Sequence, residues 1–570
     1  MLASRIRKAK RKWDELTQGS TPVVYVGCAT CGIAAGAGDL LAVLDDELSR
    51  IGVRAKVITV GCIGMCFAEP LVDVRIPGQP RICYGRVTQE KLTKILNLHV
   101  RQGKPVVGLA MGTLGDGTHS RIPRLEDLPF MKPQVRVASR NCGLINPEDI
   151  DHYLARDGYR GLERALAMKS EDVIEEVVAS ELRGRGGGGF PTGQKWRFCR
   201  SAAGRPKYLI CNGSEGDPGA FMDRTVLEGD PHAVLEGMCI AAYAIGASQG
   251  YVYVSGEYPL AIKRIKVALE DMYRIGILGD DMLGSGIAFD IQVKEGAGAY
   301  VCGEETALMA SIEGNRGMPQ PRPPFPAVKG LRGKPTSINN VETFACVSSI
   351  LREGASWFAS FGTVRSRGTK TFSLTGSIRN AGLIEVPMGI PLRQIVEEIG
   401  GGIAGGGKFK AAQTGGPSGG CLPARLGDIP MEYESLAEAG SMLGSGGLVI
   451  MDESTCMVDL ARYFLTFTQN ESCGKCTPCR LGTRRMLSML ERICAGQGRP
   501  GDVEALEELG RVVKNTSLCG LGQTAPNPVL ATIRYFREEY EEHIQDRRCR
   551  AAVCAGMISS ARRRRRTRGR

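Results

Sequence analysis

Over the first hundred residues, short apolar runs typical of strands alternate with a segment whose apolar residues have helical spacing. Strand-like runs cover Thr21–Gly27, Val53–Val60 and Leu71–Ile76, and each is rich in Val or Ile. Between the first two, Leu40–Ile51 repeats Leu and Val at the spacing of an amphipathic helix. This alternation predicts a small α/β unit over residues 1–100, because alternating strands and helices pack in layers around one core.

Glycine and proline interrupt the pattern over residues 101–145, which predicts an extended linker. Residues 146–365 then combine helical spacing with two strand-like runs, Lys207–Cys211 and Gly250–Val254, so we expect a larger α/β domain. The most apolar run, Met238–Ala247, is far too short to span a bilayer, and we expect no membrane-spanning segment.

The remaining chain divides into a β-rich part and a helical part. Residues 366–451 carry short β-like runs, many glycine turns and one helix at Leu392–Ile399. Residues 452–545 have helical spacing throughout, and residues 546–570 form an arginine-rich tail. The hydrophobic pattern as a whole therefore predicts a multidomain α/β protein.

Charge and composition narrow the class of protein. The chain has 570 residues and a net charge of +12, and seven of its arginines lie between Arg562 and Arg570. Such a block is more typical of a disordered tail than of a nucleic-acid-binding fold, so we expect no nucleic-acid partner. Met1–Trp13 is basic but lacks the apolar stretch of a secretory signal. With 20 cysteines in so long a chain, metal ligation in a reducing cytoplasm is favoured over a disulfide scaffold.

Four cysteines in the last quarter of the chain have the spacing of a metal centre. Cys473, Cys476 and Cys479 form a C-x-x-C-x-x-C motif, and Cys519 follows in a separate Ser-Leu-Cys-Gly segment. Three closely spaced thiolates and a distant fourth match the ligation of a [4Fe–4S] cluster. Zinc is the first alternative, although its sites usually contain two C-x-x-C pairs, and inert cysteines are the second. A cluster would make this an electron-transfer protein.

A glycine-rich segment in the middle of the chain, Leu182–Trp196, is the second motif with chemical meaning. It contains G-x-G-x-x-G at Gly184, Gly186 and Gly189, but a helix-like segment precedes it where a Rossmann fingerprint requires a strand. Glycines without a Cβ still let the backbone approach a flat or phosphorylated ligand and turn its N–H groups toward it. A flexible surface loop is the alternative interpretation.

Charged side chains accompany the glycines in this region. Arg185 and Lys195 lie within the glycine-rich segment, and we expect them to neutralise phosphates. Two later segments, Cys211–Arg224 and Gly296–Thr306, mix acids with glycines. Carboxylates beside such glycines suit ribose hydroxyls and the edges of a flavin ring. Each segment alone is compatible with an acidic turn, but the three together indicate a nucleotide and flavin site.

These motifs resemble those of a known family, the NADH-binding flavoprotein subunit of complex I and its relatives in NAD(P)-linked hydrogenases, formate dehydrogenases and similar reductases. The resemblance covers roughly Gln134–Ile544 and includes the glycine-rich segment, Pro323–Pro326, Asn339–Thr343 and the four cluster cysteines. It implies that FMN lies over the glycine loop and that NAD(H) stacks on it. By matching motifs, the flavin site would comprise Gly184, Arg185, Gly186, Lys195, Asn212, Glu215, Gly303, Glu304, Asn339, Asn340 and Thr343.

The same resemblance implies a second set of residues that contact the nicotinamide nucleotide, namely Phe190, Asp217, Tyr300, Glu305, Arg322 and Phe325. It also implies a Rossmann-like FMN and NAD(H) domain over 146–365, a ubiquitin-like β-grasp domain over 366–451 and a C-terminal helical bundle that holds the [4Fe–4S] cluster. Two positions depart from the family pattern. Ser214 stands where relatives commonly carry an acid, and Arg322 stands where some have lysine, which preserves the charge.

The N-terminal unit resembles the thioredoxin-like [2Fe–2S] domain that some hydrogenase-type relatives carry. Cys62 and Cys66 fit the second ligand pair of that domain. The first pair usually has C-x4-C spacing, which would place a cysteine at Val26, whereas the candidates here are Cys28 and Cys31, of which Cys31 is favoured. A domain that has lost its cluster and serves for docking is the alternative.

The last cysteine pair of the chain has no predicted role. Relatives with this N-terminal domain often continue past a Cys-x4-Cys segment into a ferredoxin domain with two more clusters, but here Cys549 and Cys554 are followed by arginines. Because a pair alone cannot hold a cubane, we predict that both are unliganded. Any further clusters would then belong to a partner chain.

Together the motifs predict an NAD(P)H:acceptor electron-transfer flavoprotein subunit. Hydride would pass between nicotinamide and FMN, and single electrons would pass through iron–sulfur clusters, so no side chain is needed as a general base. The expected partners are a thioredoxin-like [2Fe–2S] subunit and a larger iron–sulfur or catalytic subunit, in the cytoplasm or on the cytoplasmic face of a membrane complex. The alternatives are a non-catalytic electron wire or scaffold, and a nucleic-acid-associated cluster protein that uses the arginine tail.

Overall fold

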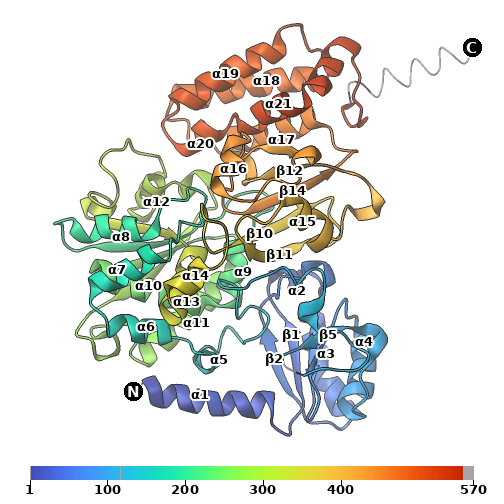
Figure 1. Cartoon of the computed structure of the whole chain (residues 1–570), viewed down its shortest axis with the longest axis vertical. Coiled ribbons are helices and arrows are strands. Elements are labelled where there is room, and N and C mark those ends of the chain that lie inside the picture. Colours follow the sequence, from blue (N-terminus) through green and yellow to red (C-terminus); the bar gives the residue numbers. More distant parts are fainter. Residues whose placement is uncertain (1, 116, 556, 558–570) are drawn as a thin grey trace, which may run out of the picture.

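Three β-sheets with their helices, followed by a layer of C-terminal helices, make up the computed structural model (Figure 1). It describes residues 2–115, 117–555 and 557. Most of the arginine-rich tail predicted over 546–570 lies outside the described residues, but its Cys549, Cys554 and Met557 are buried in the core of the C-terminal helices, so the tail begins later than predicted. No helix in the described part of the chain is both long and apolar enough to cross a membrane. The chain therefore has the multidomain α/β architecture that its hydrophobic pattern predicts.

The first sheet has five strands in the order β2-β1-β3-β4-β5. β1 runs parallel to β2 and antiparallel to β3, and Val24, Val26, Val72 and Val74 lie in the hydrophobic core that the strands form with α3 and α4. The edge strand β5 lies in the segment predicted as a linker, so the sheet extends past residue 100. The elements of this unit are β1 (Val23–Gly27), α2 (Thr30–Ala34), α3 (Ala37–Arg50), β2 (Lys56–Val60), β3 (Val72–Arg75), β4 (Arg81–Tyr84), α4 (Gln89–Ile95) and β5 (Ala110–Leu114).

The first helix, α1 (Leu2–Thr17), extends away from the first sheet (Figure 1), and its C-terminal end packs on that sheet through Leu16, which packs with Val23, Tyr25 and Val60. Its buried residues Leu2, Ile6 and Ala9 lie in the core of the second domain. The Lys10 ammonium also pairs with the Asp157 carboxylate at 2.8 Å. The N-terminal unit is therefore connected to the second domain at both of its ends, by α1 and by the segment after β5.

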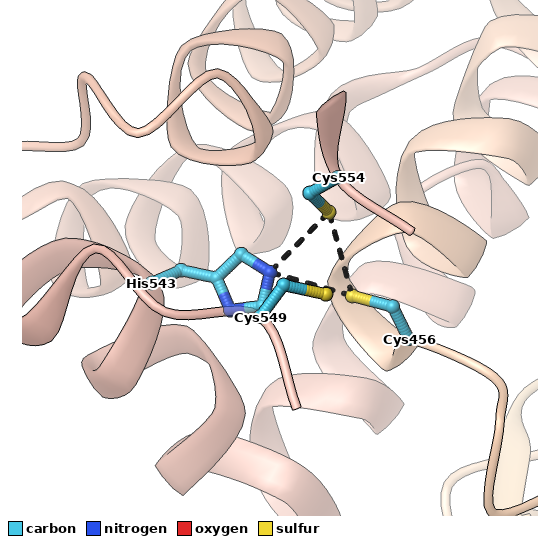
Figure 2. Close-up of side chains that lie close together, drawn as sticks. All are labelled: Cys456, His543, Cys549 and Cys554. Atoms are coloured by element: carbon cyan, nitrogen blue, oxygen red, sulfur yellow. Dashed lines mark hydrogen bonds between the residues drawn. The ribbon is translucent and has the colours of Figure 1, made fainter. Parts of the chain in front are cut away.

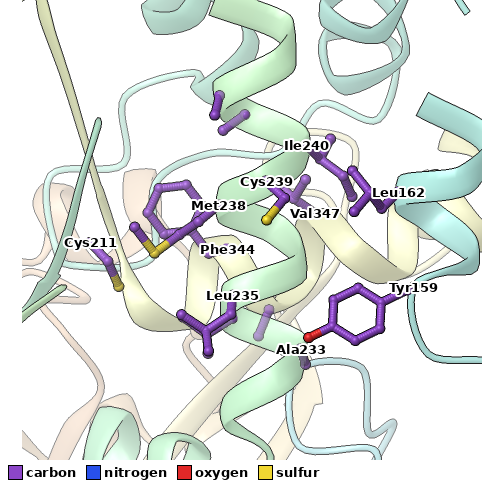
Figure 3. Packing of buried hydrophobic residues seen from close by; sticks show 14 of the residues in the cluster. Tyr159, Leu162, Cys211, Ala233, Leu235, Met238, Cys239, Ile240, Phe344 and Val347 are labelled. Atoms are coloured by element: carbon purple, nitrogen blue, oxygen red, sulfur yellow. The ribbon is translucent and has the colours of Figure 1, made fainter. Parts of the chain in front are cut away.

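The second sheet has four parallel strands in the order β8-β7-β6-β9. Helix α10 is buried on nearly all sides, which explains the apolar run at Met238–Ala247. Figure 3 shows Met238 of this helix in the core with Phe344 of α13. The elements are α5 (Ile150–Ala155), α6 (Arg160–Leu166), α7 (Ser170–Ala179), α8 (Thr192–Ser201), β6 (Tyr208–Gly213), α9 (Met222–Gly229), α10 (Pro231–Ile245), β7 (Gln249–Ser255), α11 (Pro259–Arg274), β8 (Asp290–Gly296), α12 (Glu305–Ile312), β9 (Thr336–Asn340), α13 (Val341–Glu353) and α14 (Ala355–Ala359).

The third sheet has five strands in the order β11-β10-β14-β12-β13. β10 and β11 form an antiparallel hairpin, and β10 pairs in parallel with β14 at the centre of the sheet. The predicted helix at Leu392–Ile399 follows β11 and packs on the sheet. The elements are β10 (Thr369–Gly376), β11 (Gly382–Pro387), α15 (Leu392–Gln394) with its continuation Ile395–Ile399, β12 (Phe409–Thr414), β13 (Cys421–Pro423), α16 (Tyr433–Glu438) and β14 (Gly447–Asp452).

The C-terminal part is helical, as predicted. Leu465, Met486, Leu506 and Ile533 each come from a different helix and meet in one hydrophobic core. These apolar residues recur at helical spacing, so each helix buries one face. The helices are α17 (Met457–Asn470), α18 (Thr483–Cys494), α19 (Asp502–Thr516), α20 (Gly520–Thr524) and α21 (Asn527–Glu541).

Buried contacts join the domains to one another. Lys370 in β10 forms a fully buried ion pair with Glu342 in α13. The Thr30 N–H of the first unit donates to the Glu228 carboxylate of the second domain at 2.8 Å. Met65 of the first unit lies in the hydrophobic core of the third domain. The loops at these junctions are therefore held in place by more than one domain.

Candidate functional site

The glycine-rich segment forms most of the loop between α7 and α8, and its last residues, from Thr192 to Trp196, form the start of α8. Gly187 and Gly189 have φ angles of +115° and +61°, a region that residues with a Cβ rarely adopt. A Cβ on Gly186 would lie 2.9 Å from the Cβ of Asn340, so these two segments approach each other closely. The loop conformation therefore requires glycine, as the motif predicts.

The third domain holds this loop in position. The Tyr433 hydroxyl donates to the Gly184 carbonyl at 2.8 Å, and Gly187 forms an isolated β-bridge with Gly444. Sequence reasoning missed both contacts because Tyr433 is separated from Gly184 by 249 positions and belongs to another domain. The glycine loop is thus a surface shared by two domains.

The side chain of Arg185 does not have the role that the sequence predicts. Its guanidinium is buried and donates to the backbone carbonyls of Arg183, Arg367 and Thr369 at 3.0, 2.6 and 2.9 Å. Its backbone N–H donates to the Thr343 hydroxyl at 2.9 Å. The expectation that this guanidinium neutralises a phosphate is wrong, because its donors are bound to a carbonyl of the loop itself and to two carbonyls just before and at the start of β10. Arg185 instead ties the glycine loop to the start of β10.

Lys195 lies beside an acidic residue from α12. Its Nζ is 2.5 Å from one carboxylate oxygen of Glu305 and donates to the Ile338 carbonyl at 2.7 Å. The Arg322 guanidinium lies 3.4 Å from the other oxygen of Glu305. All three charged side chains are partly exposed. Two cations and one carboxylate in this arrangement suit a ligand with both phosphates and ribose hydroxyls.

Two phenylalanine rings of the predicted nucleotide set are exposed. Phe190 follows the last glycine of the loop with 48% of its surface exposed, and Phe325 is 57% exposed. The Arg322 guanidinium lies 6.0 Å from the centre of the Phe325 ring. Exposed aromatic rings beside polar groups are typical of binding sites, because a planar ligand can stack on them and cover their apolar surface.

Three acidic or amide side chains predicted to bind flavin stand at helix starts. Glu215 accepts two backbone N–H groups from the first turn of α9, at 2.9 and 3.0 Å. Glu304 and Asn340 cap α12 and α13 in the same way. Burial raises the pKa of the Glu215 carboxyl. Their positions are therefore set by local capping, whatever ligand they contact.

The amides of Asn212 and Asn339 join segments of the predicted flavin site. Asn212 at the end of β6 donates to the Gly303 carbonyl at 3.0 Å. Asn339 in β9 accepts a hydrogen bond from the Trp196 indole N–H at 3.0 Å. The neighbouring strands β6 and β9 thus bring the predicted segments together at the same end of the parallel sheet.

Asp217 and Tyr300 lie against loops of the third domain. Ser445 donates to one Asp217 oxygen at 2.5 Å, and the Tyr300 hydroxyl lies 2.8 Å from the Ser418 hydroxyl. The other oxygen, Oδ1 of Asp217, is buried and accepts no hydrogen bond of good geometry among the described residues. Burial raises the pKa of this carboxyl, and the nearby Ser445 and Tyr300 hydroxyls partly offset that rise. A buried acceptor that lacks such a bond indicates a ligand with a hydroxyl donor, and sequence reasoning missed the two serines beside it.

The four predicted cluster cysteines come together. Cys473, Cys476 and Cys479 lie between α17 and α18, and Cys519 directly precedes α20. All four pack in one hydrophobic cluster. Burial and, to a smaller extent, the three other thiols raise the pKa of Cys479 to about 11. Four thiols gathered at this spacing fit a [4Fe–4S] cluster.

The cysteine loop contacts the segment that carries the nucleotide residues. Glu471 accepts the Tyr300 N–H at 2.8 Å. On the other side of the loop, Lys475 Nζ donates to the Pro319 carbonyl at 2.6 Å. The two predicted centres are therefore adjacent in the structure.

Three of the four N-terminal cysteines also come together. The sulfurs of Cys31, Cys62 and Cys66 all lie within 4.8 Å of one another, and those of Cys62 and Cys66 are 3.7 Å apart. Cys28 lies outside this group, in the hydrophobic core of the first unit. The structure thus groups Cys31, and not Cys28, with the C-x-x-x-C pair.

A further group of potential metal ligands lies where the sequence predicts none. Cys549 and Cys554 lie beside Cys456 and His543, and all four side chains are buried (Figure 2). The two cysteines, which the sequence predicts to be unliganded, are therefore grouped with two further potential ligands. Sequence reasoning missed the group because Cys456 precedes α17 and His543 follows α21, so neither shares a motif with the pair.

Comparison with known proteins identifies the family. Residues 177–349 match the Nuo51 FMN-binding domain, and residues 459–543 match the NADH-ubiquinone oxidoreductase-F iron-sulfur binding region. The "NADP-reducing hydrogenase subunit HndC" of Solidesulfovibrio fructosivorans is 54% identical over 428 residues, which are 75% of this chain and 87% of that protein. An F-type subunit of the NADH-quinone oxidoreductase of Rhizobium meliloti (strain 1021) is 49% identical over 414 residues, 72% of this chain and 98% of that protein. The chain belongs to the Nuo51 family of FMN-binding oxidoreductase subunits.

As a member of the Nuo51 family, the chain is an NADH-oxidising subunit that binds FMN and a [4Fe–4S] cluster and transfers electrons within a multisubunit complex. Among solved structures, an NAD+-reducing [NiFe]-hydrogenase in the H2-reduced state matches with a TM-score of 0.65 at 27% identity. That match covers 100% of this chain and 91% of the hydrogenase chain. The orphaned oxygen of Asp217 and the exposed Phe190 ring fit the ligands of this family.

Proposed function

We propose that this Nuo51 homologue passes electrons between NADH and a hydrogenase-type partner through one continuous site. When bound, FMN exchanges hydride with the nicotinamide and single electrons with the iron–sulfur centre. The observation that carries the proposal is the hydrogen bond from Tyr300 N–H to Glu471, because it joins the nucleotide segment to the cysteine loop.

For FMN, the glycine loop supplies a backbone surface, and Asn340 packs directly against Gly186. Lys195 supplies the positive charge that Arg185 cannot, since the Arg185 guanidinium is bound to carbonyls of the third domain. We infer that Arg185 and Glu215 position the loops of the flavin site, and that Gly184, Asn212, Gly303, Glu304, Asn339 and Thr343 border the flavin itself.

For the nucleotide, the exposed rings of Phe190 and Phe325 offer stacking surfaces, and Arg322 offers a charge for the diphosphate. The orphaned Oδ1 of Asp217 and the Glu305 carboxylate would accept hydrogen bonds from ribose hydroxyls. Such carboxylates disfavour a 2′-phosphate by like-charge repulsion, which supports NADH over NADPH as the physiological donor.

We propose that the first unit is a thioredoxin-like domain and the third a ubiquitin-like β-grasp domain. The order β2-β1-β3-β4 with a parallel first pair supports the former. The order β11-β10-β14-β12-β13, with β10 parallel to β14 and a helix after the first hairpin, supports the latter. Through Tyr433, Ser418 and Ser445 the β-grasp domain would close one side of the nucleotide site.

We further propose that the first unit holds a [2Fe–2S] cluster on Cys31, Cys62, Cys66 and Glu69. A cluster of this type needs four ligands, and Cys28 is directed elsewhere. One carboxylate oxygen of Glu69 lies 3.6 Å from the Cys31 sulfur, and the other accepts the Leu71 N–H at 2.8 Å, which fixes its orientation.

The ligand set can be tested on the full chain by electron paramagnetic resonance of the reduced protein. Glu69→Ala should remove the [2Fe–2S] signal, and Glu69→Cys should keep it with altered g values, because a thiolate replaces an oxygen ligand. The matched control is Cys28→Ala, which removes a buried thiol and should leave the signal unchanged. Loss of the signal in Cys28→Ala together with its retention in Glu69→Ala would assign the fourth position to Cys28.

A hydrogenase-type partner is supported by the extent of the comparisons. The solved hydrogenase chain aligns over 100% of this chain, first unit included, whereas the Rhizobium meliloti relative aligns over 72%. None of the 20 cysteines forms a disulfide, which supports a cytoplasmic complex. The complex purified with this chain should reduce NAD+ with H2. If the complex instead reduces quinone with NADH and shows no H2 activity, the partner is a quinone-reducing one. The proposed NADH site would be unaffected by that result.

A further inference from the structure

We propose that Cys456, His543, Cys549 and Cys554 bind a single zinc ion that anchors the C-terminal segment to the helical layer. Figure 2 shows the four side chains pointing toward one another. They come from three separate places: the residue before α17, the turn after α21 and the segment that follows it. None of them belongs to the [4Fe–4S] motif or to the N-terminal cysteine group.

The distances match those of a tetrahedral site. With Zn–S and Zn–N bonds of about 2.3 and 2.0 Å, a regular tetrahedron places two sulfurs about 3.8 Å apart and a sulfur about 3.5 Å from a nitrogen. The sulfurs of Cys456 and Cys554 are 3.8 Å apart, and each lies 3.4 Å from Nε2 of His543. The Cys549 sulfur lies within 4.8 Å of the other three ligand atoms.

The histidine ring is oriented for metal binding. Its Nδ1 lies 2.6 Å from the backbone carbonyl of Glu539 and donates a hydrogen bond to it. This contact places the proton on Nδ1, so Nε2 presents its lone pair to the three sulfurs. A backbone carbonyl in this position is the usual outer partner of a zinc-bound imidazole.

The surroundings favour a closed structural site. Cys549 and Cys554 are buried in the hydrophobic core of the C-terminal helices, and His543 is 1% exposed. The Asp459 N–H at the start of α17 points at the Cys456 sulfur at 3.5 Å and helps to balance the negative charge of three thiolates. Three cysteines and one histidine leave no open position, which is the pattern of structural rather than catalytic zinc.

Other uses of these residues fit less well. A disulfide requires sulfurs about 2.05 Å apart and would leave the histidine without a partner. A cubane holds its cysteines around a body of eight atoms, so its ligands stand farther apart than those around one ion. Cys494, at the end of α18, packs in the same hydrophobic core but does not belong to the group of mutually close ligand atoms.

The proposal can be tested by metal analysis of the full chain, purified without chelators and with its FMN and iron–sulfur content measured in the same sample. We expect about one zinc per chain in the wild type. In Cys549→Ser and in His543→Gln, zinc should fall to below about a tenth of that value, because each change removes a ligand. FMN and iron content should stay unchanged in both variants. The matched control is Cys494→Ser, a buried thiol in the same core that should retain its zinc.

A second measurement uses the wild type alone and does not depend on the folding of the variants. Replacement of the ion by Co2+ should produce the intense visible bands of a tetrahedral site and thiolate-to-cobalt charge transfer. Wild-type protein that contains no zinc and takes up no Co2+ would overturn the proposal. So would full zinc retention in Cys549→Ser, or additional iron in place of zinc at this site.

Discussion

Neighbouring residues in the glycine loop serve different purposes, and single hydrogen bonds distinguish them. Gly186 lies against Asn340, whereas Arg185 turns its guanidinium away from the site and into the third domain. Lys195 places its ammonium group next to the Glu305 carboxylate. We expect such a loop to bind its ligand through the shape of its backbone and one or two charged side chains. The effect of a substitution should therefore differ from one loop position to the next.

Replacement of Gly186 by Val should remove FMN. The new Cβ would lie 2.9 Å from the Cβ of Asn340, and the branched side chain would force the loop out of its position. We expect flavin absorbance of the purified variant to fall to a small fraction of wild type, with the iron of the [4Fe–4S] cluster retained. Gly108→Val is the control, because nothing lies within 4 Å of a Cβ there. Full flavin occupancy in Gly186→Val would show that the loop does not hold FMN.

Replacement of Glu305 by Gln should slow NADH oxidation while FMN stays bound. The variant keeps the shape of the side chain and removes the charge between Lys195 and Arg322. A hydrogen bond to a charged group contributes about 1.5–3 kcal/mol, so kcat/KM for NADH with a dye acceptor should fall about tenfold or more. The control is Glu295→Gln, an exposed glutamate paired with Lys266. Unchanged kinetics would remove Glu305 from the nucleotide site.

At the scale of elements, the predicted site residues lie at the ends of helices and strands. Glu304 and Asn340 cap α12 and α13, and Asn212 lies near the end of β6. The cluster cysteines lie between α17 and α18 and directly before α20. Side chains at such ends leave the hydrogen bonds of the element intact while facing a ligand.

Replacement of Cys476 by Ala should abolish the C-terminal cluster. One of four thiolate ligands is lost, so the iron content should fall by about four atoms per chain and the signal of the reduced cluster should disappear. FMN should remain, because the flavin residues lie on other elements. Iron analysis and low-temperature spectroscopy of the variant measure both effects. An unchanged iron content would contradict the assignment of this ligand.

At the scale of the whole molecule, the third domain contacts the predicted flavin and nucleotide segments of the second. It contacts the glycine loop through Tyr433, and its β10 carries Lys370, whose ammonium pairs with Glu342 of α13. Both members of this ion pair are buried. Without its partner, either side chain would leave an unpaired charge in a medium of low dielectric constant. The relative placement of the two domains therefore depends on this pair.

Replacement of Lys370 by Met should destabilise the junction by about 3–5 kcal/mol, because the Glu342 carboxylate is left buried without its partner. Calorimetry should record a lower Tm for the corresponding transition. The double variant Lys370→Met with Glu342→Leu removes both charges and should recover most of the loss. A single variant as stable as the wild type would show that the pair does not hold the domains together.

Local patterns in the sequence were sufficient for much of this protein. The C-x-x-C-x-x-C spacing, the glycine loop and the paired acids predict the cofactors, because these features need only neighbouring residues to express their chemistry. The strand-like runs around Val23 and Tyr208 likewise predict elements that the structure contains.

Tertiary structure alone decided which residues from distant segments contact one another. It directed the guanidinium of Arg185 to Thr369, placed Ser418 and Ser445 beside Tyr300 and Asp217, and brought Cys456 and His543 to the last cysteine pair. Each of these contacts joins residues that share no local motif, and their pairing depends on how whole domains and helices pack. Periodicity and motif spacing describe only the local part of the chain, so they contain no signal for such contacts.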